Sequence, residues 1–242
     1  MNMKNVLLLS VVLFYLNANA QTSRHALYVG GNVSGIDLDL SSSGIHGLDR
    51  RDFSKARTGF MLGYKYQLAL SSRWTMGTGL SFNNFNYEFH RPFYNEPGDI
   101  NPNLTSVSET MNFYRFSIPV QVSYNFIKAE KHSVYTSLGA DLNLTNNVSR
   151  TADYKIPGPP TGFVDGQFKK NQSIKFNENS FGLSLVASIG SEIEIRNKTF
   201  LIELSYYNDI SESRFQTLKN IEQDNYYFGR LKSVQVKIGY VF

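Results

Sequence analysis

The chain alternates apolar and polar residues with a period of two, in stretches long enough to be strands. In the segment 114–126, YRFSIPVQVSYNF, every even position is apolar, and the odd positions from 115 on are Arg, Ser, Pro, Gln, Ser and Asn. Alternate side chains of a strand point to opposite faces, so this pattern predicts a strand with one apolar and one polar face. With seven further stretches of the same kind, the predicted strands are 25–34, 60–70, 74–82, 112–126, 134–144, 181–195, 200–206 and 234–242.

The connections between these strands alternate in length. Short turns are predicted at 71–73, 127–132 and 196–198. Long polar segments are predicted at 39–55, 91–108, 149–177 and 211–226. Short turns at one end and long loops at the other are typical of outer-membrane barrels. No internal repeat or linker interrupts the pattern, so we predict a single domain.

A soluble β-sandwich would alternate in the same way, with its apolar faces packed inward. Two features favour a membrane barrel. The polar faces are rich in Gly, Ser, Asn and Gln, which suits a cramped interior, and the apolar faces are long enough for the roughly 9–11 residues of a spanning strand. We therefore predict an all-β fold, an eight-stranded antiparallel up-and-down transmembrane β-barrel, with the apolar faces toward lipid. A secreted soluble β domain is the alternative.

Two positions predict local irregularities in the strands. The phase of the alternation changes after Gly35, in GIDLDL, which predicts a bulge there. Pro119 lacks a backbone N–H in the middle of a predicted strand, which predicts a bulge or bend at that residue.

The first twenty residues predict a secretory signal peptide. Lys4 provides a positive start, 6–16 is an apolar run, and Ala18-Asn19-Ala20 is a small-residue cleavage site. We expect a mature chain from Gln21, a barrel domain covering 21–242, and export to the outer membrane of a Gram-negative bacterium. No later apolar run approaches the roughly 20 residues that a transmembrane helix needs.

Composition adds three constraints. The chain has no cysteine, so no disulfide framework stabilises it. Its formal charge of +4, which becomes +3 without Lys4, is too weak and dispersed to indicate nucleic-acid binding. Aromatic residues make up 14% of the chain, which suits either a β-rich core or the aromatic belts of a membrane interface.

Charged residues on the polar faces predict a plugged interior. They come from six different strands and are Lys65, Arg115, Asp141, Glu192, Glu203 and Lys237. An eight-stranded barrel has an interior just wide enough to be filled by side chains, and buried charges must be paired. We therefore expect a network of salt bridges in the lumen and no wide aqueous channel, although a small gated ion leak is an alternative.

Candidate chemistry is sparse. The histidines are His25, His46, His90 and His132. Of these, His90 is placed at the predicted outer rim, with Glu88 on the same face, and we interpret this pair as a polar rim. Asp37 and Asp39 are interpreted as a solvated turn. We predict no catalytic residue, no cofactor and no metal site, and hence a protein that is not an enzyme.

Two segments carry resemblances to known families. The last strand, which ends in Tyr240 and Phe242, resembles the C-terminal assembly signal of bacterial outer-membrane proteins. The segment 114–126 resembles a strand of the outer-membrane β-barrel domain common in Bacteroidota, a porin-like family that includes PorT-like proteins and small barrels similar to outer-membrane protein A. That family has an Ile-Pro within one strand and a small Gly in the next, here Ile118-Pro119 and Gly139. Ser117 stands where family members commonly have an acidic residue, so no side-chain role there carries over.

These observations predict an outer-membrane protein whose external loops serve binding, adhesion or envelope structure. Expected partners are outer-membrane lipid, lipopolysaccharide and the barrel-assembly machinery, and no nucleic acid. The PorT-like resemblance implies an alternative, a component of a surface protein-secretion machine. A lipid-modifying enzyme or a small ion leak ranks third.

Overall fold

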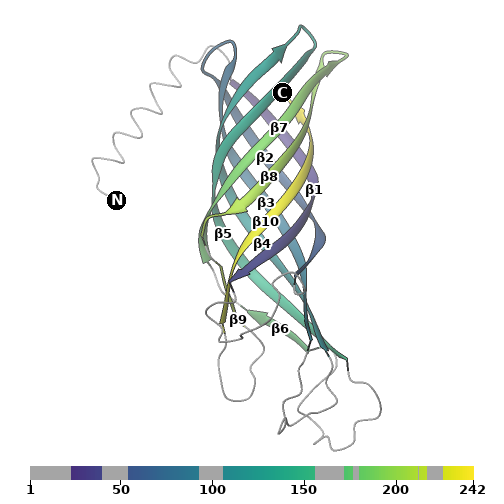
Figure 1. The fold of residues 1–242 in the computed structure, drawn as a ribbon. Helices are drawn as coiled ribbons and strands as arrows, with labels where there is room; N and C mark the ends of the chain where they lie inside the picture. Colours follow the sequence, from purple (N-terminus) through teal and green to yellow (C-terminus); the bar gives the residue numbers. More distant parts are fainter. Residues whose placement is uncertain are drawn as a thin grey trace, which may run out of the picture.

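The structure, a computed structural model, describes residues 23–39, 54–92, 106–155, 172–176, 180–211, 213–216 and 226–242. Within these ranges the strands are β1 (Ser23–Asp39), β2 (Ser54–Ala69), β3 (Trp74–Pro92), β4 (Ser106–Lys128), β5 (His132–Lys155), β6 (Gln172–Phe176), β7 (Ser180–Ile195), β8 (Lys198–Asp209), β9 (Ser213–Gln216) and β10 (Tyr226–Val241). Eight of them form a ring of antiparallel pairs in the order β1-β2-β3-β4-β5-β7-β8-β10 (Figure 1).

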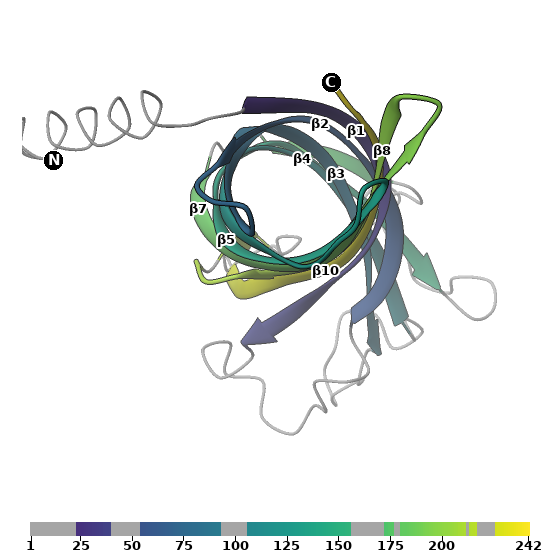
Figure 2. The same ribbon diagram turned by 90° about the horizontal axis from the view of Figure 1, so that it is seen from above.

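The ring closes between the first and last strands. β1 pairs with β10 in an uninterrupted register from Ala26↔Val241 to Asp39↔Phe228. Seen from above, the strands surround a single lumen (Figure 2). The predicted eight-stranded antiparallel barrel is therefore confirmed.

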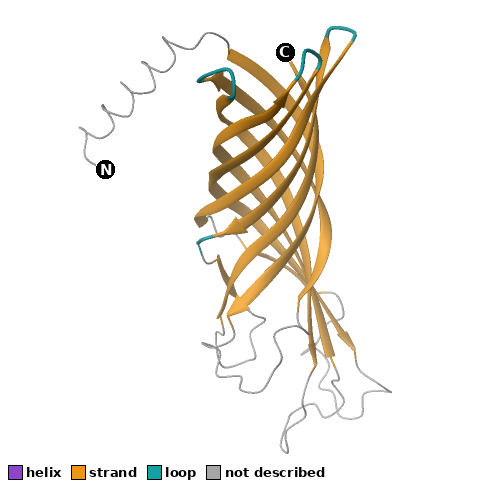
Figure 3. Ribbon diagram, turned by 45° about the horizontal axis from the view of Figure 1, so that its top comes forward, coloured by secondary structure: helices purple, strands orange, loops and turns teal. Residues whose placement is uncertain are grey.

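The short connections also follow the prediction, whereas most of the four predicted long polar segments lie outside the described residues. β2 and β3, β4 and β5, and β7 and β8 are joined by short turns that lie at one end of the barrel (Figure 3). In the turn between β7 and β8, Arg196 and Asn197 both have positive φ, 52° and 63°, as a two-residue type I′ turn requires. We call this the short-turn end, and the opposite end the loop end.

Alternation decides which face is exposed. On β4, the even residues Val120 and Val122 are 40% and 42% exposed on the outside of the barrel. The odd residues Gln121 and Ser123 are 6% and 4% exposed and face the lumen. The outward faces of all eight barrel strands are mainly apolar, so an apolar belt surrounds the barrel and its polar side chains are enclosed.

The predicted bulge near Gly35 is wrong. β1 keeps its register with β10 across this residue, from Val33↔Val234 to Ile36↔Leu231. The alternation changes phase because the inward face of the barrel becomes apolar toward the loop end. Ile36 pairs there with Leu231 of β10, whose side chain is 1% exposed.

Of the bulge or bend predicted at Pro119, the bulge is wrong. Pro119 pairs with Asp141 in an unshifted register between β4 and β5. On the other side, the β3–β4 pairs skip from Thr78↔Val120 to Ser81↔Ser117 and keep the same register. The missing N–H of proline therefore interrupts one ladder without inserting an extra residue.

Several strands extend beyond the predicted limits at the loop end. β3, β4 and β5 pair as far as Pro92, Ser106 and Lys155. Two segments predicted as loop form the short strands β6 and β9, which pair with β5 and β10. The loop end is therefore uneven, and β3, β4, β5 and β6 together form what we call the raised sheet (Figure 1).

Candidate functional site

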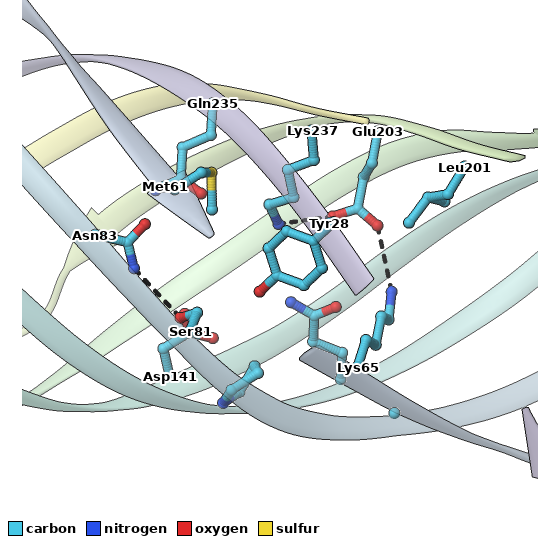
Figure 4. A pocket seen from close by; sticks show the side chains of 13 residues that line it. Tyr28, Met61, Lys65, Ser81, Asn83, Asp141, Leu201, Glu203, Gln235 and Lys237 are labelled. Atoms are coloured by element: carbon cyan, nitrogen blue, oxygen red, sulfur yellow. Dashed lines mark hydrogen bonds and ion pairs between the residues drawn. The ribbon is translucent and has the colours of Figure 1, made fainter. Parts of the chain in front are cut away.

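The interior of the barrel brings together most of the charged residues that the sequence singled out. Glu203, on β8, is 2% exposed. Its carboxylate accepts hydrogen bonds from Lys237 Nζ at 2.7 Å, Lys65 Nζ at 3.3 Å and the Tyr135 hydroxyl at 2.7 Å. Figure 4 shows the two lysines reaching this carboxylate from opposite sides. Two ammonium groups and a phenol thus satisfy one buried acid.

Arg115 occupies a second centre, closer to the loop end. Its guanidinium donates to both carboxylate oxygens of Asp209, at 2.8 and 3.0 Å. It also donates to Thr145 Oγ1 at 3.1 Å, and it lies 5.4 Å from the centroid of the Phe85 ring. Such a two-pronged pair is a strong form of ion pair and fixes the orientation of both side chains.

A ladder of polar side chains continues from Asp209 across the lumen. Ser184 Oγ donates to Asp209 Oδ1 at 2.5 Å, and Asn143 Nδ2 donates to Ser184 Oγ at 2.6 Å. Ser117 and Tyr207 each donate a hydroxyl to Asn143 Oδ1, at 2.7 and 2.8 Å. Residues from four strands are therefore tied to one another within the barrel.

The two remaining predicted residues lie elsewhere in the lumen. Glu192 pairs with Arg24 at 2.6 Å near the short-turn end. Asp141 is 6% exposed, and its Oδ1 has no hydrogen-bond partner among the described residues. It lines a cavity of about 20 Å³ beside Lys237 and Glu203, which has room for about one water molecule (Figure 4).

The charges of the described interior balance once Arg24, whose side chain is 43% exposed at the edge of the lumen, is counted. The cations are Arg24, Lys65, Arg115 and Lys237, and the carboxylates are Asp141, Glu192, Glu203 and Asp209. Balance of this kind lowers the cost of burial, because an unpaired buried ion costs several kcal/mol.

Two apolar clusters, which were not predicted from the sequence, flank the Glu203 and Arg115 centres. Toward the loop end the lumen contains Phe85, Tyr87, Phe113, Val186, Tyr207 and Leu231. Toward the short-turn end it contains Ala26, Tyr135, Leu201 and Val241. Near that end a second cavity of about 110 Å³ is lined by Arg24, Glu192 and several serines. The described interior is thus filled in layers of polar and apolar side chains.

Two interior residues were missed from the sequence. Asp209 lies three residues beyond the predicted end of its strand, on the same face as Glu203 and Ser205, so extending the alternation would have found it. Arg24 stands one residue before the first predicted strand, and no sequence signal marked it as the partner of Glu192.

Three of the four histidines considered as candidate chemistry lie in the described part of the chain. His25 lies near the short-turn end, where its Nδ1 is 2.6 Å from the Tyr64 hydroxyl and its ring stacks on Phe242. His132 begins β5 at the same end, and His90 lies near the end of β3. His46 falls outside the described residues. Among the described residues, no group of three or more His, Cys, Asp or Glu side chains could hold a metal ion.

A comparison with known families identifies the kind of barrel. Residues 19–213 match the model of the outer membrane protein beta-barrel domain. The chain belongs to this family. In this outer-membrane barrel, the enclosed polar residues form the lumen and the exposed apolar belt is the membrane-facing surface. No helix in the described part of the chain is long and apolar enough to cross a membrane.

Solved structures of outer-membrane proteins are similar to the barrel at low identity. Ail, the attachment invasion locus protein of Yersinia pestis, is 17% identical with a TM-score of 0.37, covering 92% of this chain and 100% of Ail. OprG of Pseudomonas aeruginosa is 11% identical with a TM-score of 0.46, covering 92% and 97%. The protease OmpT of Escherichia coli is 9% identical with a TM-score of 0.44, covering 93% and 98%. No curated protein sequence matches the chain.

Proposed function

We propose that this outer-membrane barrel is a binding or adhesion protein of the Gram-negative outer membrane, with the loop end outside the cell. The observation that supports this role is the raised sheet. Beyond Phe82 and Tyr114, the outward side chains change from apolar to polar, and Asn84 Nδ2 donates to Asn112 Oδ1 at 2.9 Å. β3 continues from Asn84 to Pro92, about 30 Å at roughly 3.3 Å per residue.

A paired sheet of this length is a different binding surface from a set of loops. Its backbone is already ordered by ladder hydrogen bonds between β3, β4 and β5. Binding a partner therefore costs less conformational entropy than it would on a set of loops. β6 pairs with β5 along one edge, and its other edge has no strand partner among the described residues. Such an edge can accept an extended segment of a partner protein by strand addition.

The proposal extends to how the protein reaches the membrane. We propose a cleaved signal peptide at 1–20 and an assembly signal in Tyr240 and Phe242, which are 40% and 59% exposed on the outside of the last strand. We further propose that the protein is not an enzyme, because seven of the eight interior charges are held in ion pairs. The Ile118-Pro119 and Gly139 resemblance supports placing it with the Bacteroidota family.

Single cysteines test the topology cleanly, because the chain has none of its own. Lys175→Cys, in β6, should react with a membrane-impermeant maleimide on intact cells. Asn197→Cys, in the turn between β7 and β8, should react only after the outer membrane is opened. The reverse pattern would place the raised sheet inside the cell and exclude the adhesion role.

The binding role needs its own variant. Replacing 89–109 with Asn-Gly would join Glu88 to Thr110, which face each other in register, and would remove the end of the β3–β4 hairpin. We expect this variant to remain a heat-modifiable barrel and to lose the adherence that the wild type gives to expressing cells. Equal adherence of cells carrying either protein would contradict the proposal.

A further inference from the structure

The short-turn end carries aromatic side chains at the edge of the apolar belt. The rings of Trp74 and Tyr124 lie 4.9 Å apart, and those of Phe200 and Tyr240 lie 5.9 Å apart. Trp74, Phe200 and Tyr240 are all more than a third exposed on the outside of the barrel. Trp and Tyr prefer the level of the lipid head groups, so these pairs mark one membrane boundary.

Exposed cations lie directly beyond this boundary, in all three short turns. They are Arg73, Lys128, Lys131, Arg196 and Lys198. The acids in the same segments are fewer, namely the exposed Glu130 and the half-exposed Glu194. The turn end therefore presents a net positive rim at the height where lipid phosphates lie.

Arg73 is the best-positioned of these cations. Its guanidinium donates to the Tyr124 hydroxyl at 3.1 Å, beside the Trp74 ring. Its backbone is held as well, because the Asn125 N–H donates to the Arg73 carbonyl at 2.9 Å and the Arg73 N–H donates to Ser71 Oγ at 3.3 Å. A guanidinium has five N–H donors, so most remain available to a ligand after the bond to Tyr124.

We propose that the short-turn rim binds the phosphate groups of anionic phospholipids, and that Arg73, Trp74 and Tyr124 form its principal site. The guanidinium fork matches two phosphate oxygens, which is why arginine is common in phosphate recognition. The Trp74 and Tyr124 rings lie on the membrane side of the cation, where they contact the glycerol and upper acyl region of the same lipid. Cations next to an anionic lipid surface each strengthen association by about fivefold.

Trp74 makes the site directly observable, because it is the single tryptophan of the chain. The folded protein is reconstituted in phosphatidylcholine vesicles that contain a brominated lipid, with the bromine on the acyl chain near the head group. In one titration the brominated lipid is phosphatidylglycerol, and in the other it is phosphatidylcholine. Bromine quenches tryptophan fluorescence at short range, so the two titrations give the relative affinity of each lipid for this site. We expect the wild type to prefer phosphatidylglycerol by about fivefold at low salt, and less at high salt.

Variants separate a local site from general attraction. Arg73→Gln should abolish the preference, and Tyr124→Phe, which removes the acceptor of the arginine, should reduce it. Lys198→Gln removes the same charge from the opposite side of the ring, since β3 and β8 are separated by three strands in either direction. It should leave the quenching of Trp74 unchanged.

Three results would overturn the proposal. One is equal quenching by both lipids in the wild type. Another is an equal loss of preference in Lys198→Gln and Arg73→Gln, which would indicate diffuse charge attraction. The third is suppression by millimolar inorganic phosphate at constant ionic strength, which would indicate a simple anion site. Each variant is first checked for heat-modifiable migration, so that loss of folding is not mistaken for loss of binding.

Discussion

Glu203 and Arg115 show how single charged residues are accommodated inside a narrow barrel. Glu203 is shared between two lysines, and Arg115 is held by both oxygens of Asp209. Removing water from these groups is costly, and the cost is offset only when every charge has a partner with good geometry. Removing one of these side chains therefore destabilises the barrel mainly because its charged partner stays buried without a counter-ion.

Replacing Arg115 with Met should leave Asp209 buried without a counter-ion, since Asp209 is 3% exposed. We expect the free energy of unfolding, measured by urea titration in lipid vesicles, to fall by about 3–5 kcal/mol. Adding Asp209→Asn to the same chain should restore part of the loss. The control is Arg57→Gln, which breaks the exposed pair with Glu88 at 2.6 Å and should cost less than about 1 kcal/mol. Equal costs for Arg115→Met and Arg57→Gln would show that the interior pair is not dry.

At the scale of one element, β4 explains why the sequence pattern was informative. Its middle residues alternate strictly between lipid and lumen, because a spanning strand has an apolar solvent on one side only. Beyond the belt this contrast is lost. There Asn84 and Asn86 of β3 replace apolar outward residues, while Phe85 and Tyr87 fill the lumen. The extensions of β3 and β5, and the short strands β6 and β9, were missed for this reason.

The two faces of β4 should respond oppositely to the same substitution. Val122→Leu adds a methylene toward lipid and should be neutral, whereas Ser117→Leu inserts a larger side chain into a lumen position that is 2% exposed and hydrogen-bonded to Asn143. Overpacking of a filled interior costs typically about 1–3 kcal/mol. Val120→Arg should cost about 2–4 kcal/mol, because Val120 lies near the middle of the apolar belt between Tyr114 and Tyr124, and the substitution puts a charge near the bilayer midplane. Urea unfolding in vesicles measures all three, and equal tolerance of leucine at both positions would refute the face assignment.

For the whole molecule, the sequence predicted the barrel, its strand number, its turns and its two faces. These all follow from one constraint, since a membrane demands closure and strict alternation. The interior was predicted less completely. Lys65 and Lys237 were expected to be paired, but the choice of Glu203 over Asp141 as their acceptor depends on the stagger of β2, β8 and β10, which alternation does not specify. The apolar layers in the lumen were missed because a polar interior was assumed along its full length.

The layered filling predicts that the barrel conducts little. The charged network is closed off toward the loop end by Phe85, Phe113 and their neighbours, and the cavity at Glu203 is about 20 Å³. In a planar bilayer we expect no steady current from the wild type, and at most rare, small openings. Replacing Phe85 and Phe113 with Ala should remove two of the rings over which Arg115 lies, at 5.4 and 5.5 Å, and should raise the frequency of openings. The matched control replaces Phe82 and Phe116 with Ala, because these two rings lie 5.0 Å apart on the outside of the barrel. This variant should show the same current as the wild type. A steady nanosiemens-scale conductance from the wild type would contradict the filled lumen and would identify the protein as a porin.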